Sequence, residues 1–393
     1  MRGLPVKGCR WVTLQELEDR HADWRRLAAT CEFPTAFADP AWVLAWWQSY
    51  GDSHEPWCLA VEDGDGSLRG LALLACRGTP LTRTLTFAGG GTWNGLNTLL
   101  CAQGFESEFC TLLLEALSAR NREWDVWRIQ RLPASSVLAS TLLDGHGVLR
   151  AAAHDTRLQP FLALPDDTNT FEARFGSKQR NTQRRKWRRL EEFGARARLV
   201  TDADEVELVL RTLLDLRRQR AKALNQHHEH MDARFERFIL TVVHGMAPEG
   251  VRLWTLEADG ETLAIRLNLV QGSREHSYLL GLGDAHAALS PGSSLERHAI
   301  LEAITEGRTE LDLGPGRDVY KYRLGADDRE LKRLVVSSGS ARGFCVAGLA
   351  AADLRLRNTA AADAVRRLRG LTPQRAISGQ AEKTAQQRAS QMP

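Results

Sequence analysis

The sequence lacks several features that would assign it to a special class. Its longest apolar stretches, such as residues 344–352, fall well short of the roughly 18 residues that a membrane-spanning helix needs. No apolar core typical of a secretory signal follows the first methionine. Charge of one sign is not in excess, because 52 lysines and arginines balance 49 aspartates and glutamates. We therefore expect a cytoplasmic protein without a membrane partner, in which any attraction to a polyanion comes from local clusters.

The sequence also lacks a framework of cysteines or metal ligands. Its seven cysteines are odd in number and scattered, and none forms a C-x-x-C pair. This pattern is typical of reduced, buried thiols. The run from His227 to His230 has no second ligand cluster to support it, and adjacent histidines on a helix point apart. We expect no metal site.

What the sequence does contain is a repeated pattern of strands and helices. Each half shows a hairpin around an Asp-Gly turn, a further strand, a helix and another strand. Matching points lie about 185 to 195 residues apart, which predicts a duplicated α/β unit. In the first half the expected segments are 57–61, 70–76, 81–87, 108–120 and 124–130; in the second half they are 252–257, 262–270, 275–282, 294–306 and 309–313.

The same pattern suggests the domain boundaries. With 393 residues, the chain has room for two or three domains at roughly 150 residues each. A polar Pro-Asp-Asp-Thr segment favours a division after residue 165. We predict domains at 1–165 and 166–340, a helix at 341–369 and a disordered tail at 370–393, whose polar sequence lacks periodicity.

The segment 178–189 is the most unusual one, because seven of its twelve residues are basic. On a helix, Arg180 and Arg184 share one stripe, while Lys178 lies on another. Asn181 interrupts the charges. One interpretation is a binding site for phosphates of a nucleotide cofactor or of RNA. The other is a solvated surface helix that docks through Trp187.

A second segment ends a strand near Leu282 and starts a helix with Ser290, Pro291, Gly292, Ser293 and Ser294. A helix N-terminus offers unpaired backbone N–H groups and a positive dipole, which suits a pyrophosphate. Simple capping of the helix by one of the serines is the alternative.

A third segment follows a strand that ends at Asp312 and breaks at Gly-Pro-Gly. Tyr320, Lys321, Tyr322 and Arg323 come next, and polar groups at the carboxyl end of a strand are a usual place for an active site. A tyrosine hydroxyl can return a proton to a leaving thiolate. Aromatic packing and an ordinary Asp–Arg pair are the alternative reading.

Four segments in this order resemble a known family. They are PTAFADPAWVLAWWQSYG, SKQRNTQRRKWRRLEEFG, LSPGSSLERHAILEAI and ELDLGPGRDVYKYRLG. Together they resemble the CelD-like acetyltransferases associated with cellulose biosynthesis, a branch of the GNAT superfamily, with Fem-type aminoacyltransferases as relatives. The resemblance spans residues 33–335. It implies an α/β (α+β) fold of tandem GNAT-like domains, each with a mixed, mostly antiparallel sheet flanked by helices, the first copy being degenerate.

The resemblance also implies roles for the residues above. Backbone groups of Leu279, Leu280 and Gly281 would hold the pantetheine of acetyl-CoA or another acyl-CoA, and Pro291 to Ser294 would hold its pyrophosphate. The usual Q/R-x-x-G-x-G/A loop is absent here. The family's motif residues fall on Tyr320, Lys321 and Asp312, which are the implied catalytic residues, and Tyr322 is a second candidate for the acid. From the charge pattern we expect Lys178, Arg180, Asn181, Arg184 and Arg323 to bind the substrate.

The leading functional hypothesis is therefore an N-acyltransferase. An amine of a small molecule, such as a sugar or amino-acid derivative, would attack the thioester directly, a donor near Leu280 would hold the oxyanion, and Tyr320 would protonate the thiolate. One alternative is a Fem-type transfer from aminoacyl-tRNA, with the basic segment on the RNA. Another is a non-catalytic binding protein with this fold. The sequence does not indicate an oligomeric state.

Overall fold

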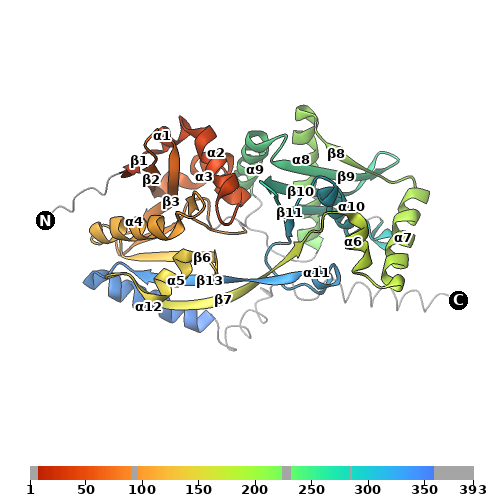
Figure 1. Ribbon diagram of the computed structural model, residues 1–393. Helices are drawn as coiled ribbons and strands as arrows, with labels where there is room; N and C mark the ends of the chain where they lie inside the picture. Colours follow the sequence, from red (N-terminus) through yellow and green to blue (C-terminus); the bar gives the residue numbers. More distant parts are fainter. Residues whose placement is uncertain (1–7, 91–94, 224–231, 284–285, 358–393) are drawn as a thin grey trace.

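The described part of the chain forms one large sheet covered by helices (Figure 1). The computed structural model describes residues 8–90, 95–223, 232–283 and 286–357. Within these residues thirteen strands pair, twelve of them in the order β1-β2-β3-β4-β6-β13-β7-β12-β11-β10-β9-β8, with β5 beside β3. Only the pairs β4–β6 and β11–β12 are parallel there. The expected mixed, mostly antiparallel α/β architecture is confirmed.

The strands and helices have these bounds. The strands are β1 (Cys9–Val12), β2 (His54–Glu62), β3 (Leu68–Gly78), β4 (Arg83–Phe87), β5 (Leu100–Cys101), β6 (Val126–Pro133), β7 (Arg150–Ala163), β8 (Arg196–Val200), β9 (Val251–Ala258), β10 (Glu261–Gln271), β11 (Arg274–Leu282), β12 (Glu310–Asp312) and β13 (Asp327–Ser337). The α-helices are α1 (Leu14–Glu18), α2 (His21–Thr30), α3 (Pro40–Tyr50), α4 (Glu106–Ala119), α5 (Val137–Asp144), α6 (Thr168–Ala173), α7 (Ser177–Glu192), α8 (Ala203–Ala223), α9 (Ala233–Met246), α10 (Pro291–Thr305), α11 (Val319–Arg323) and α12 (Ala341–Arg357).

The two halves of the sheet repeat one pattern and exchange a strand. In each half, four antiparallel strands are followed by a parallel neighbour, β6 after β4 and β12 after β11. The next strand then comes from the other half of the sequence: β13 lies beside β6, and β7 lies beside β12. β7 and β13 also pair with each other along their length and run through both halves (Figure 1). Each half of the sheet thus contains a strand from the other side of the division expected at residue 165. Helix α12 begins at Ala341, and the segments 358–369 and 370–393 lie outside the described residues.

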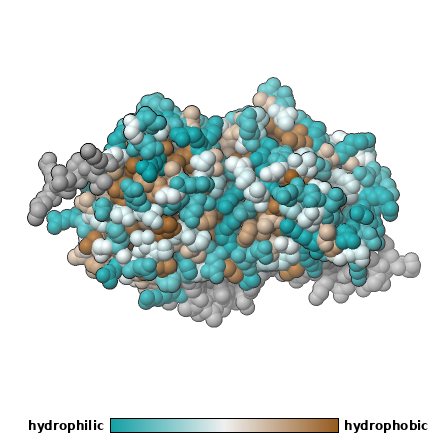
Figure 2. All heavy atoms as spheres, viewed as in Figure 1, coloured by the Kyte–Doolittle hydropathy of each residue, from teal (hydrophilic) through white to brown (hydrophobic). Residues whose placement is uncertain are grey.

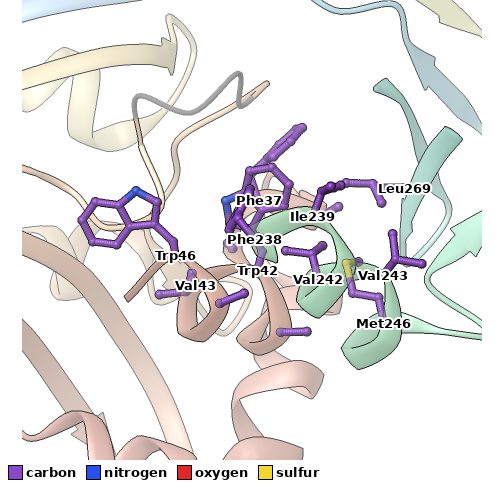
Figure 3. Packing of buried hydrophobic residues seen from close by; sticks show 14 of the residues in the cluster. Phe37, Trp42, Val43, Trp46, Phe238, Ile239, Val242, Val243, Met246 and Leu269 are labelled. Carbon is purple, nitrogen blue, oxygen red and sulfur yellow. The ribbon is translucent and has the colours of Figure 1, made fainter. Parts of the chain in front are cut away.

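Helices α3 and α9 join the two halves through an aromatic and aliphatic core. Asp39 caps α3, since its Oδ1 accepts a hydrogen bond from Ala41 N at 2.8 Å, and Pro40 occupies the first helical position. Trp42 is fully buried and meets Phe238 of α9 edge-on, with ring centroids 4.9 Å apart. Figure 3 shows Val242 and Val243 of α9 beside these rings. Trp42 and Trp46 of α3 are core residues, and the partly buried Trp47 packs against them.

This core predicts a large stability loss on truncation of its central ring. Trp42→Ala should lower the free energy of unfolding by about 3–5 kcal/mol, because it leaves a cavity between α3 and α9. Leu81→Ala is the control: Leu81 is 81% exposed, so the change should stay within about 0.5 kcal/mol. Urea unfolding followed by far-UV circular dichroism measures both. Equal midpoints for the two variants would contradict the assignment.

Candidate functional site

The site begins where β12 stops following β11. The two parallel strands pair over only three positions, from Arg274 with Glu310 to His276 with Asp312. β11 then continues to Leu282 along β10 alone, while the chain after Asp312 turns away. One backbone edge of β11 is therefore not paired with β12 over residues 277–282. The residues expected from the resemblance to hold pantetheine, Leu279 to Gly281, lie in this segment.

A β-bulge sets the direction of the backbone groups on that edge. The register against β10 shifts so that Tyr278 is an extra residue between Ser277 and Leu279. Beyond the bulge, Gly283 N donates to Leu263 O of β10 at 3.0 Å, and by strand alternation Leu279 and Gly281 also face β10. Leu280 must then point its N–H and C=O away from β10. Its carbonyl indeed accepts a hydrogen bond from Arg217 Nη1 of α8 at 3.0 Å.

The N-terminus of α10 lies beside this edge. A Cβ added to Gly292 would come 2.5 Å from the end of the Leu282 side chain, so the helix start packs directly against β11. Ser290 stands just before the helix with φ 57°, and its side chain does not cap the helix. Ser293 Oγ donates back to Ser290 O, whereas the buried Ser294 Oγ has no hydrogen-bond partner in the described part of the chain. The predicted residues of the strand edge and of the helix start are thus neighbours.

Asp312 is buried and its carboxylate is fully engaged. Gln159 Nε2, on β7, donates to both carboxylate oxygens at 2.9 and 2.7 Å, and Gly314 N donates to Oδ1 at 2.7 Å. These bonds hold the Gly-Pro-Gly turn at the end of β12. In this geometry the Asp312 carboxylate anchors the turn through three hydrogen bonds.

Lys321 is also buried and holds the same turn. Its Nζ donates to the carbonyls of Gly314, Pro315 and Gly316 at 3.0, 2.9 and 3.0 Å. An ammonium group has three donors, and all are used. Burial lowers the pKa of Lys321, and the negative charges of Asp318 and Asp312 oppose that effect. Lys321 thus supports the loop from which Tyr320 projects.

The two tyrosines of α11 differ in what their hydroxyls contact. Tyr322 donates to Asp328 Oδ1 at 2.7 Å and accepts from Arg317 Nε at 2.9 Å, so its hydroxyl is occupied. Tyr320 is 39% exposed, and partial burial raises the pKa of its phenol, with a further rise from the negative charge of Glu296. No hydrogen bond among the described residues engages the Tyr320 hydroxyl. Of the two phenols it is therefore the one free to contact a bound molecule.

A buried ion pair on α10 and β10 completes this side of the site. Arg266 Nη2 contacts Glu296 Oε1 at 2.8 Å and Ser277 Oγ at 2.7 Å, and both charged side chains are almost fully buried. Our sequence reasoning missed this pair, together with Gln159 and His276. A charged residue inside an apolar run, as Arg266 is in LAIRLNL, is the signal that could have marked it.

The basic helix α7 lies at the edge of this region. Gln179 Nε2 donates to Arg323 O at 2.7 Å, which brings the start of α7 against the end of α11. Arg180 Nη1 donates to Phe175 O and lines a small pocket with Phe171 and Leu324. Lys178, Asn181, Arg184 and Arg323 are exposed, and the end of the molecule over α7 is strongly hydrophilic (Figure 2). None of these four approaches the unpaired edge of β11 through a described contact.

Two further expectations concern metal ligands and membrane-spanning helices. The run His227–His230 lies outside the described residues, and the rest of the described chain shows no group of three or more potential metal ligands. Likewise, no helix among the described residues has both the length and the apolar character to cross a membrane.

Comparisons with known proteins agree with this architecture. Residues 177–322 match the model of the acetyltransferase (GNAT) domain, and no curated protein matches the chain significantly. FemX has a similar structure, with a TM-score of 0.60 and 13% identity over 82% of this chain and 96% of FemX. The C-terminal domain of a putative lysylphosphatidylglycerol synthetase from Agrobacterium fabrum has a TM-score of 0.51 and 13% identity over 86% of this chain and 96% of that domain. A conserved protein of unknown function from Bacteroides thetaiotaomicron has a TM-score of 0.51 and 12% identity over 85% of this chain and 99% of that protein.

These comparisons define the class of the second half. Residues 177–322 form a GNAT-type acyltransferase domain, and this segment contains β11, β12, the N-terminus of α10 and Tyr320. The similar solved structures show the fold alone, because their identity to this chain is low.

His276 predicts a pH dependence of stability. Ala36 N donates to its Nε2 at 3.5 Å, which leaves the ring proton on Nδ1, 4.0 Å from Asp312. Burial lowers the pKa of His276, although Asp312 opposes that effect. Below about pH 6.5 the unfolded chain therefore binds a proton at this histidine more readily than the folded protein does. The free energy of unfolding consequently falls as the pH is lowered through that range, and His276 causes no such loss above it.

His276→Gln should reduce this acid-side loss. Urea unfolding at about pH 7.5 and about pH 5.5 should show a smaller decrease in the free energy of unfolding than in the unmodified protein. His244→Gln, at an exposed position of α9, is the matched control and should keep the original decrease. An unchanged decrease in the His276 variant would refute the role given to this ring.

Proposed function

We propose that this protein transfers an acyl group, with acetyl as the first candidate, from acyl-CoA to an amine of a small molecule by direct attack. The observation that carries the proposal is the edge of β11 that continues past β12 beside the N-terminus of α10. An extended chain with amide groups, such as pantetheine, can pair with an unpaired strand edge. We also propose that the chain is a tandem repeat divided near residue 165, of the CelD-like branch, because the strand pattern of the two halves repeats.

The residues at the edge fit an acyl-CoA. The orphaned, buried Oγ of Ser294 at the N-terminus of α10 can donate to a phosphate oxygen, together with the backbone N–H groups of Gly292 and Ser293. The close approach of Gly292 to Leu282 keeps the helix start against the strand edge. Acyl-CoA supplies the activated thioester; the protein's part is to hold it and to handle charge and protons.

In the proposed mechanism, the N–H of Leu280 stabilises charge that develops on the carbonyl oxygen. Tyr320 donates its proton to the departing sulfur, and the proton that the amine nitrogen releases on forming the amide returns to the phenolate, so that the thioester and amine become an amide and a free thiol. Glu296 and Arg266 fix the surroundings of the hydroxyl. Asp312 and Lys321 position α11 by holding the turn before it.

The two tyrosines offer a matched test. Tyr320→Phe should lower kcat by about 10²-fold or more, because it removes the proton donor while keeping the ring. Tyr322→Phe should change kcat by less than about threefold, since that hydroxyl contacts Asp328 and Arg317 instead. Release of free thiol from acetyl-CoA in the presence of an amine panel measures both. Full turnover in the Tyr320 variant would remove Tyr320 from the acid role.

A second candidate is an aminoacyl-tRNA-dependent transfer of the Fem type. The observation in its favour is α7, whose exposed Arg184, Arg185 and Arg189 have no ion-pair partner among the described residues, in contrast to Arg188, which meets Glu192. Such a cationic helix suits a phosphate backbone. The third reading, a binding protein without catalysis, predicts no turnover with either donor.

A thermal-shift comparison separates the donors. Acetyl-CoA should raise Tm under the leading proposal, and the shift should survive replacement of Arg184 and Arg185 by Ala. Charged tRNA should instead be the stabilising ligand under the second candidate, with a salt-dependent effect that those replacements remove. Replacing the exposed Arg122 by Ala provides the charge-matched control. A shift with tRNA and none with acetyl-CoA would overturn the leading proposal.

A further inference from the structure

Tyr278 turns toward the first half of the protein because it is the extra residue of the β11 bulge. Its ring packs against Trp42, with centroids 5.4 Å apart, and against Phe37 at 6.1 Å. Its hydroxyl is buried, yet it has no hydrogen-bond partner in the described part of the chain. A buried hydroxyl without a partner is costly, so its persistence at this position needs an explanation.

Arg131 lies in the first half, also at a bulge, and its charge acts on the Tyr278 hydroxyl. Two residues of β6, Gln130 and Arg131, lie opposite the single residue Arg333 of β13. Arg131 has φ 52°, a strained value for a residue other than glycine. Asn97 secures this backbone, because its N–H donates to Arg131 O and its Nδ2 donates to Gln130 O. The side-chain Nη1 of Arg131 is buried and has no partner among the described residues.

Arg217 approaches from α8 on the second half. Its Nη1 donates to Leu280 O, which fixes the guanidinium beside the strand edge, while its buried Nε lacks a partner within the described residues. Burial raises the pKa of Tyr278, and Arg217 and Arg131 both oppose that rise, so both charges act on one hydroxyl.

Neither arginine has a carboxylate to neutralise it in the described structure. The carboxylate whose charge acts on Arg131 is Asp312, and its oxygens already accept hydrogen bonds from Gln159 and Gly314. Arg266 shows the usual solution, since it is buried against Glu296. A guanidinium remains charged when buried, and a buried charge is stable only when it is paired.

We propose that Arg131, Arg217 and the Tyr278 hydroxyl bind an oxyanion, a carboxylate or a phosphate, that the amine acceptor carries. The acceptor would then be an amino acid or a phosphorylated amine rather than a neutral amine. That the bound anion belongs to an acceptor rests on the proposed function. The anion site itself is inferred from the three buried donor groups that lack a partner among the described residues. Guanidinium groups suit both oxyanions, because their forked donors match the spacing of the oxygens.

The test uses inorganic phosphate and acetate as probes of the two oxyanions. Thermal unfolding at constant ionic strength should show a rise in Tm with at least one of them. Arg131→Gln and Arg217→Gln should each weaken the apparent affinity by at least about tenfold. Arg122→Gln, which removes the same charge from an exposed position, should leave it unchanged. Tyr278→Phe keeps the ring packing and should weaken the apparent affinity for the anion by about threefold. This variant provides the test if an arginine variant does not fold.

The outcomes are separable from those of the proposed function. Stabilisation by phosphate alone assigns a phosphorylated acceptor, and stabilisation by acetate alone assigns a carboxylate. Equal shifts in the Arg131, Arg217 and Arg122 variants, or no shift of the unmodified protein with either probe, would overturn the site. Neither result changes the expected shift with acetyl-CoA, which depends on the β11 edge and α10.

Discussion

The site depends on one constraint: β12 can follow β11 for only three residues. After Asp312 the chain enters a Gly-Pro-Gly turn, and proline cannot donate a ladder hydrogen bond. Asp312 and Lys321 then fix the turn from opposite sides, one by accepting a backbone N–H and the other by donating to three carbonyls. The unpaired edge of β11, the position of Tyr320 and the start of α10 all follow from this early separation.

The exchanged strands explain how both halves contribute to that place. β7 carries Gln159 to the Asp312 carboxylate, although the two residues are 153 positions apart in the sequence. β13, which follows the second half, pairs with β6 and shapes the bulge that turns Arg131. Because β7 pairs with β13 on one side and with β12 on the other, a shift of either half would disturb β12, the strand that ends at Asp312.

The sequence predicted what depends on local signals. The two Asp-Gly hairpins and the strand that ends at Asp312 each have turn residues at short range. Gln159 and Arg131 could not be found in that way, because their importance arises from pairings across the whole chain. The bulge at Tyr278 is likewise invisible in the alternation of β11, since it appears only as a shift against β10.

The two faces of the sheet near β11 differ in how they treat buried charge. On the face covered by α10, Arg266 and Glu296 neutralise each other, and the nearby Tyr320 hydroxyl remains protonated. On the face covered by α8 and α3, Arg217 and Arg131 act on Tyr278 without a free carboxylate between them. An acyl donor held along the strand edge would therefore meet a neutral proton donor on one side. An acceptor with a negative group would be attracted to the other side, which would bring its amine to the strand edge between them.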